Sequence, residues 1–110
     1  MAEITDDFMR EMLSKSKAYT LMILKAGPNP DADSDRIVWE HGRRNFVLRA
    51  DGVLSIVCPV PDDREVCGIG IFDADADQVR RLMDEDPAVR AGVFVYELHP
   101  CRSFPGDALA

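Results

Sequence analysis

The fold is decided by Asp86-Pro87-Ala88-Val89-Arg90-Ala91-Gly92-Val93-Phe94-Val95-Tyr96-Glu97-Leu98-His99-Pro100. An acidic residue and a proline close one helical segment, and a short turn with a glycine leads into a strand at about 92–99. Along this strand Phe94, Tyr96 and Leu98 point to one side, and Val93 and Val95 to the other. Because both sides are apolar in so small a chain, we expect something outside the monomer to cover one of them.

Length and charge restrict the protein's class. The chain has 110 residues, 46% hydrophobic and 30% charged, as is typical of one globular domain. Its net charge is −7 and no run of basic residues interrupts it, so nucleic acid and anionic membrane are not expected partners. The N-terminus resembles no signal peptide, and the three cysteines have no CxxC spacing. We therefore expect a cytoplasmic protein without disulfides.

The order of the predicted elements indicates the fold class. Helices are predicted at 5–16, 34–49 and 73–86, and strands at 18–25, 53–60, 66–72 and 92–99, with turns at 27–30 and 61–64. After the first helix this is the β-α-β-β-α-β order of the split βαβ, or ferredoxin-like, α+β fold. We expect an N-terminal helical extension at 1–17, the domain itself at 18–104 and a tail at 105–110.

Such a fold places both helices on one face of a four-stranded antiparallel sheet and leaves the other face bare. The strands are apolar on both faces, which predicts a symmetric homodimer with its two sheets packed face to face. The alternative is a monomer whose N-terminal helix covers the bare face. That helix has an apolar stripe: Phe8, Met9, Met12 and Leu13.

The helix predicted at 34–49 has two apolar sides. One side carries Ile37, Val38, His41, Asn45 and Leu48, and we expect it to face the sheet. Trp39 and Phe46 lie on the opposite side, which we expect to meet the N-terminal helix or a second subunit.

The chain resembles the YCII-related family of dimeric α+β barrels. The resemblance rests on Tyr19–Lys25, His41, Gly52–Leu54, Cys58–Val60, Gly68–Phe72 and above all Asp86-Pro87-Ala88-Val89-Arg90-Ala91-Gly92-Val93. It covers roughly residues 18–104, and the N-terminal helix departs from the short family members. It implies a dimeric barrel with a His–Asp pair in a pocket, which corresponds here to His41 and Asp86.

A carboxylate that binds one imidazole nitrogen fixes the tautomer and leaves the other nitrogen for general acid–base chemistry. Both residues also have structural interpretations. A histidine on an apolar helix face is often a hydrogen-bonded core residue, and Asp followed by Pro is a typical helix N-cap.

The predicted substrate-binding residues are Tyr19, Pro59, Gly68, Gly70 and Tyr96. The two glycines indicate either room for a ligand or a close approach of helix to sheet. Tyr19 and Tyr96, with Trp39 and Phe94, either line a pocket for an aromatic ligand or belong to the core.

No cofactor or metal is expected. Cys58, Cys67, His99 and Cys101 fit no common zinc spacing. Gly68-Ile69-Gly70 lies inside a strand and lacks the third glycine of a nucleotide-binding loop. Ser55 and Ser103 lack the context of a nucleophile elbow.

The sequence thus predicts a homodimeric, cofactor-independent enzyme. Its expected substrates are small organic molecules, including aromatic ones. The resemblance implies a lyase, such as one that eliminates HCl from a chlorinated ring, or an isomerase, with His41 as general acid/base. The alternative is a non-enzymatic small-ligand-binding or regulatory module in which His41 is structural.

Overall fold

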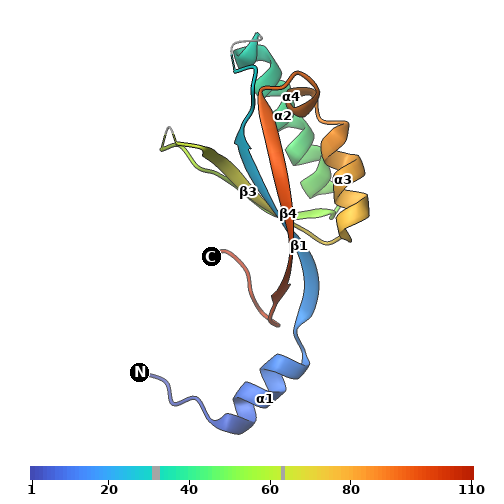
Figure 1. The fold of residues 1–110 in the computed structure, drawn as a ribbon. Helices are drawn as coiled ribbons and strands as arrows, with labels where there is room; N and C mark the ends of the chain where they lie inside the picture. Colours follow the sequence, from blue (N-terminus) through green and yellow to red (C-terminus); the bar gives the residue numbers. More distant parts are fainter. Residues whose placement is uncertain (31–32, 63) are drawn as a thin grey trace.

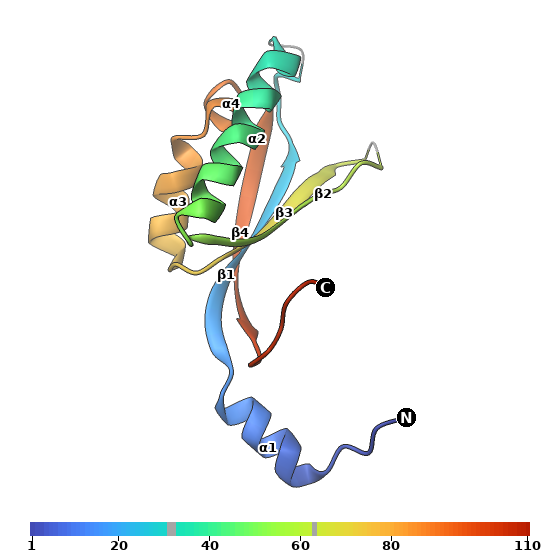
Figure 2. The same cartoon turned by 180° about the vertical axis from the view of Figure 1, so that it is seen from behind.

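A computed structural model describes residues 1–30, 33–62 and 64–110. The elements are α1 (Asp6–Ser14), β1 (Lys17–Ala26), α2 (Ser34–Ala50), β2 (Leu54–Pro59), β3 (Val66–Phe72), α3 (Ala76–Asp84), α4 (Pro87–Arg90) and β4 (Phe94–Ser103). The strands form one antiparallel sheet in the order β2-β3-β1-β4, with α2, α3 and α4 on one face (Figures 1 and 2). This confirms the predicted ferredoxin-like α+β fold. Asp63, part of the turn predicted at 61–64, lies outside the described residues.

The helix predicted at 73–86 is α3, and the short turn predicted after it contains a further helix, α4. α3 ends at Asp84, and α4 begins at Pro87 after Asp86 has adopted an extended backbone with φ −67° and ψ 133°. Proline excludes the helical conformation at the residue before it, so the helix cannot continue through Asp86. The observed helix is therefore shorter than predicted at both ends, and the interpretation of Asp86 as an N-cap is confirmed.

A glycine turn ends α4 and aims the chain into β4. Gly92 has φ +76°, and the Gly92 and Val93 N–H groups donate to the Val89 and Ala88 carbonyls, which is a Schellman motif. The loop after β1 is bound to this turn, because Gly27 donates to the Val93 carbonyl at 2.8 Å. The start of β4 is thereby held against the end of β1.

The hydrophobic core lies between the sheet and its helices. Its buried members are Met22, Leu24, Leu48, Leu54, Phe72, Val79 and Met83. Phe94, Tyr96 and Leu98 of β4 pack against them, on the face predicted from the strand's alternation. Core packing thus occupies the helix-covered face along all four strands.

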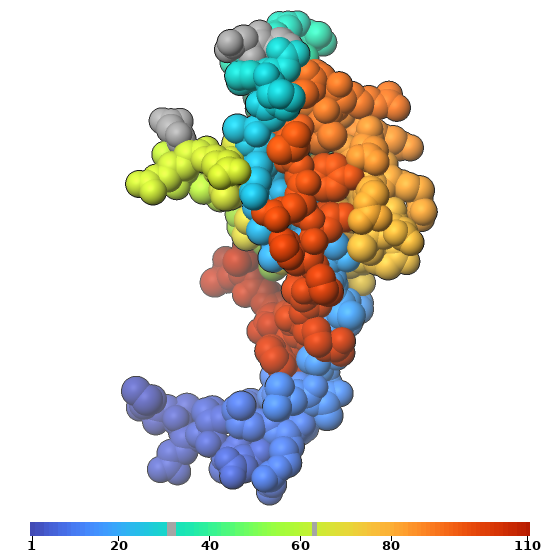
Figure 3. Space-filling model, in the orientation of Figure 1, coloured from blue at the N-terminus to red at the C-terminus, as the bar shows by residue number. Residues whose placement is uncertain are grey.

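The opposite face of the sheet is apolar, and no helix of the described chain covers it. The strand register places these partly buried side chains on it: Leu21, Ile23, Ile56, Cys58, Ile69 and Ile71. The alternative in which α1 covers this face is wrong for the single chain, because α1 has no buried residue and stands apart beyond the sheet (Figures 1 and 3).

The expected packing of α1 on Trp39 and Phe46 does not occur within one chain either. The two aromatic residues are 69% and 62% exposed. The reason is topological: Lys17–Tyr19 pair only with the end of β4, beyond the first β1–β3 partner at Thr20. This two-stranded arm holds α1 at the far end of the molecule from α2 (Figure 2).

Two glycine substitutions test this packing. A Cβ on Gly27 would lie 2.3 Å from the Gly92 carbonyl oxygen, whereas a Cβ on Gly42 would meet nothing within 4 Å. Gly27→Ala should lower the free energy of unfolding by about 2 kcal/mol or more, because the backbone must shift. Gly42→Ala should raise it by about 0.5–1 kcal/mol, because alanine favours the helix. Urea unfolding measures both, and equal effects would contradict the close contact at Gly27.

Candidate functional site

The structure brings His41 and Asp86 into contact across 45 residues of sequence. His41 lies in the middle of α2, and Asp86 is the N-cap of α4. His41 Nδ1 lies 2.9 Å from both carboxylate oxygens, and the two residues are 7% and 0% exposed. The hydrogen bond implied by the resemblance is therefore present and shielded from water.

The Asp86 carboxylate serves two helices at once. Besides His41, it accepts the Ala88 and Val89 N–H groups at 3.0 and 3.2 Å. Burial by itself raises the pKa of Asp86, but the hydrogen bonds from His41 and the two backbone amides outweigh it and hold this pKa below its usual range. Asp86 is therefore a carboxylate at neutral pH.

An ionised Asp86 determines the tautomer of His41. A carboxylate only accepts hydrogen bonds, so Nδ1 of a neutral His41 carries the proton and Nε2 presents its lone pair. The side-chain amide of Asn45 lies 3.3 Å from Nε2 and donates to it. The Phe94 ring meets the imidazole edge-on with 5.1 Å between ring centroids. His41 is therefore oriented by groups on three sides.

His41 and Asn45 border a cavity of about 210 Å³ between α2 and the β2–β3 strands. Most residues that line it are apolar, and its polar side chains include those of His41 and Asn45. The volume is below the range typical for drug-sized ligands, so the cavity suits a molecule about as large as one small ring. A basic imidazole nitrogen in an apolar pocket can accept a proton from such a molecule.

Of the predicted substrate-binding residues, Pro59 and Gly68 line this cavity. Gly70 faces the core, where an added Cβ would lie 3.2 Å from both Leu54 and Phe72. Tyr19 lines a separate cavity of about 570 Å³ near the start of α3. The Tyr96 hydroxyl donates to Asp84 at 2.6 Å, and burial followed by this carboxylate raises the pKa of Tyr96 to about 12. The structure therefore places three of the five away from His41.

Two residues near the pair were not among the predicted site residues. Asn45 follows His41 by one helical turn, so its place on the same face was visible in the sequence, but its bond to Nε2 was not. An Arg44 guanidinium nitrogen lies 3.7 Å from Asp86, buried and without a hydrogen-bond partner among the described residues. The adjacent Arg43 and Arg44 gave no signal in the sequence that one of them turns inward.

No metal site appears in the part of the chain that the structure describes, since no three His, Cys, Asp or Glu side chains there converge. The cysteines Cys58, Cys67 and Cys101 are free thiols. No helix among the described residues has the length and apolar character to span a membrane.

The chain matches no known family profile, and no curated protein sequence matches it significantly. Among solved structures, it is similar to the 5-chloro-2-hydroxyhydroquinone dehydrochlorinase TftG of Burkholderia phenoliruptrix AC1100, in complex with 2,5-dihydroxybenzoquinone. The TM-score is 0.58 at 19% identity, over 74% of this chain and 90% of that one. At this identity the likeness shows a shared fold.

Two substitutions at Asp86 distinguish the stability that comes from its capping hydrogen bonds from the stability that comes from its negative charge. Asp86→Ala should cost about 3 kcal/mol, because it removes the cap and leaves buried N–H groups unsatisfied. Asp86→Asn keeps a capping oxygen and should cost about 1 kcal/mol at neutral pH. Urea unfolding measures both, and equal losses would contradict a capping role.

The stability of the native protein should also depend on pH through Asp86. Its pKa is lowered on folding, so the ionised group contributes stability above about pH 4, its unfolded value, and loses it as pH falls through the folded value. The advantage of the native protein over Asp86→Asn should therefore shrink between pH 6 and pH 3. A constant difference would mean that the charge adds nothing.

Proposed function

We propose that this protein is a YCII-related, cofactor-independent enzyme that moves a proton on a small, ring-shaped organic molecule. The observation that carries the proposal is the buried Nδ1–carboxylate bond at 2.9 Å on a histidine that lines a cavity. His41 is the general acid/base, and Asp86 is the residue that orients it. TftG, a dehydrochlorinase of the same fold that was solved with a small quinone, supports this class of substrate.

In the lyase form of the reaction, Nε2 takes a proton from the substrate. The electron pair released from that bond forms a new double bond to a neighbouring carbon. The C–Cl bond of that carbon breaks, and chloride leaves with the electron pair of this bond, so that HCl is lost overall. The carboxylate of Asp86 stabilises the imidazolium formed in this step, and water later removes the proton. In the isomerase form, His41 returns the proton to a different atom of the same molecule.

Asn45 has a specific place in this scheme. Its bond to Nε2 is long, at 3.3 Å, and its side chain lines the same cavity. A substrate proton must replace the Asn45 amide at Nε2, after which the amide is free to bind a substrate oxygen.

The hydrogen bond between Asn45 and His41 Nε2 also supports a second function, in which the protein binds a small ligand without acting as an enzyme. With Asp86 on Nδ1 and Asn45 on Nε2, both nitrogens of His41 are satisfied, as in a structural histidine. The module binds a small ring in the cavity and leaves its protons unchanged.

Proton exchange distinguishes the two functions. Chlorinated and unchlorinated hydroxyhydroquinones are incubated with the protein in D₂O, and NMR follows ring deuteration while an electrode follows chloride. We expect one or both signals, with a loss of about 100-fold or more in His41→Gln. The matched control is His99→Gln, since His99 is the chain's other histidine and is exposed. Binding of a ring without deuteration or chloride release would favour the module.

We also propose a cytoplasmic homodimer in which the open sheet faces pack together. The support is the apolar side chains on the uncovered face and the free thiols. Sedimentation at low micromolar concentration should give about twice the 12.3 kDa monomer mass. A stable monomer under these conditions would rule out the face-to-face dimer.

A further inference from the structure

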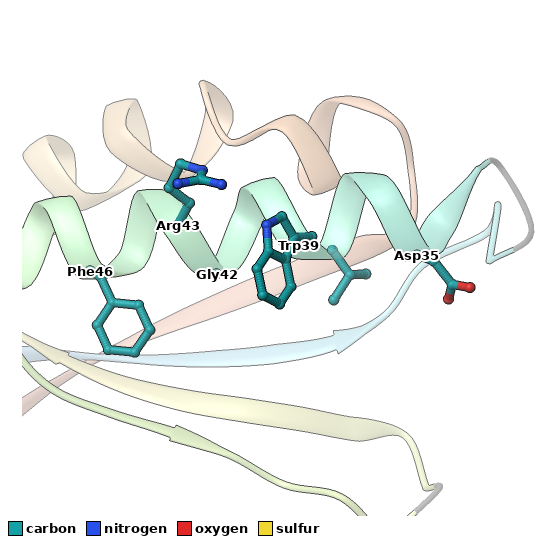
Figure 4. A pocket seen from close by; sticks show the side chains of 6 residues that line it. Asp35, Trp39, Gly42, Arg43 and Phe46 are labelled. Atoms are coloured by element: carbon teal, nitrogen blue, oxygen red, sulfur yellow. The ribbon is translucent and has the colours of Figure 1, made fainter.

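The outer side of α2 carries an apolar groove that the proposed reaction does not use. Its volume is about 540 Å³, and it is lined by Asp35, Val38, Trp39, Gly42, Arg43 and Phe46. Trp39 and Phe46 project from the same side of the helix, on either side of Gly42 (Figure 4). Single exposed apolar residues are normal, but two large rings that border one groove are typical of an interaction surface. We call these six residues the α2 groove.

Helix α1 is the second apolar surface without a partner. Phe8, Met9 and Leu13 are exposed, and with Met12 they form one stripe. The helix has nine residues, and helices this short are marginal in water without packing. It is nevertheless well formed at its start, where Thr5 caps the Phe8 N–H at 3.1 Å. Both facts indicate a helix built to pack against something.

Within one chain the two surfaces cannot meet. Only two residues separate α1 from β1, and the β1–β4 arm carries α1 beyond the sheet, while α2 lies along its other end (Figures 1 and 2). The molecule extends 53 Å in its longest direction. The arm thus holds α1 away from its own α2.

The charges of the two surfaces are complementary. Residues 1–16 contain four acidic and two basic side chains, whereas α2 contains four arginines and two acidic side chains. Three of those arginines are exposed: Arg36, Arg43 and Arg49, and the last stacks on the Phe46 ring at 5.6 Å. By helical geometry, Asp6 and Glu11 flank the apolar stripe of α1, and Glu11 also pairs with Lys15 at 2.6 Å.

We infer that α1 of one copy of this chain docks into the α2 groove of a second copy. In a two-fold dimer the exchange is reciprocal, so both helices and both grooves are covered and the assembly closes. Val38 and Gly42 also line the His41 cavity, so the docked helix covers the adjoining side of that cavity. The inference concerns assembly and does not depend on the proposed chemistry.

Photo-crosslinking between isotopically distinct chains tests the exchange. Benzoylphenylalanine replaces Met9, and the full-length ¹⁵N-labelled protein is mixed with unlabelled protein before irradiation. We expect crosslinks from position 9 to the peptide that spans α2, with one ¹⁵N and one ¹⁴N member. Crosslinks confined to a single chain, crosslinks to the sheet face, or no crosslinks at a concentration where the protein is dimeric would each overturn the inference.

Fluorescence gives a second, independent test, because Trp39 is the chain's single tryptophan. Met12→Asp places a charge in the apolar stripe and should shift the Trp39 emission maximum to the red by several nanometres. Ser14→Asp adds the same charge on the opposite face of α1 and should leave the emission unchanged. Neither residue belongs to the core, so both variants keep the fold. No shift in Met12→Asp, or the same shift in both variants, would overturn the inference.

Discussion

The buried carboxylate of Asp86 is the interaction on which the other features depend. It caps α4 through two backbone amides and binds His41 of α2, so it joins two helices that are 45 residues apart. A buried carboxylate is stable only when its oxygens are bound to donors, and here α4 supplies two backbone amides and α2 supplies the His41 imidazole. The orientation of α2, the short turn of α4 and the tautomer of His41 therefore form one linked arrangement.

Asp86 lies in a rigid part of the fold, and its partner His41 borders a cavity. The Gly92 turn is bound to the loop after β1, which holds the C-terminal end of α4 next to the sheet. On the other side of α2, the cavity next to His41 is small and largely apolar, so a bound ring would meet little water there. Low polarity strengthens the Asp86–His41 hydrogen bond.

Three apolar surfaces of the described monomer have no partner: the open face of the sheet, the α2 groove and the stripe on α1. The proposed face-to-face dimer accounts for the open face of the sheet. The proposed exchange of α1 would cover the groove and the helix together. In that proposal the N-terminal helix has a use that the ferredoxin-like domain does not require.

The sequence by itself determined the alternation of each strand, the ferredoxin-like order and the punctuation by Asp86-Pro87 and Gly92, because these follow from local backbone preferences. It also pointed to His41 and Asp86, through a resemblance. Tertiary structure alone decided that Asn45 and Arg44 surround the pair, that Gly70 and Tyr96 serve packing, and that α1 stands away from α2. The physical reason is that such contacts depend on strand register and on the distances between elements, whereas residue type and spacing report only the conformation of each segment.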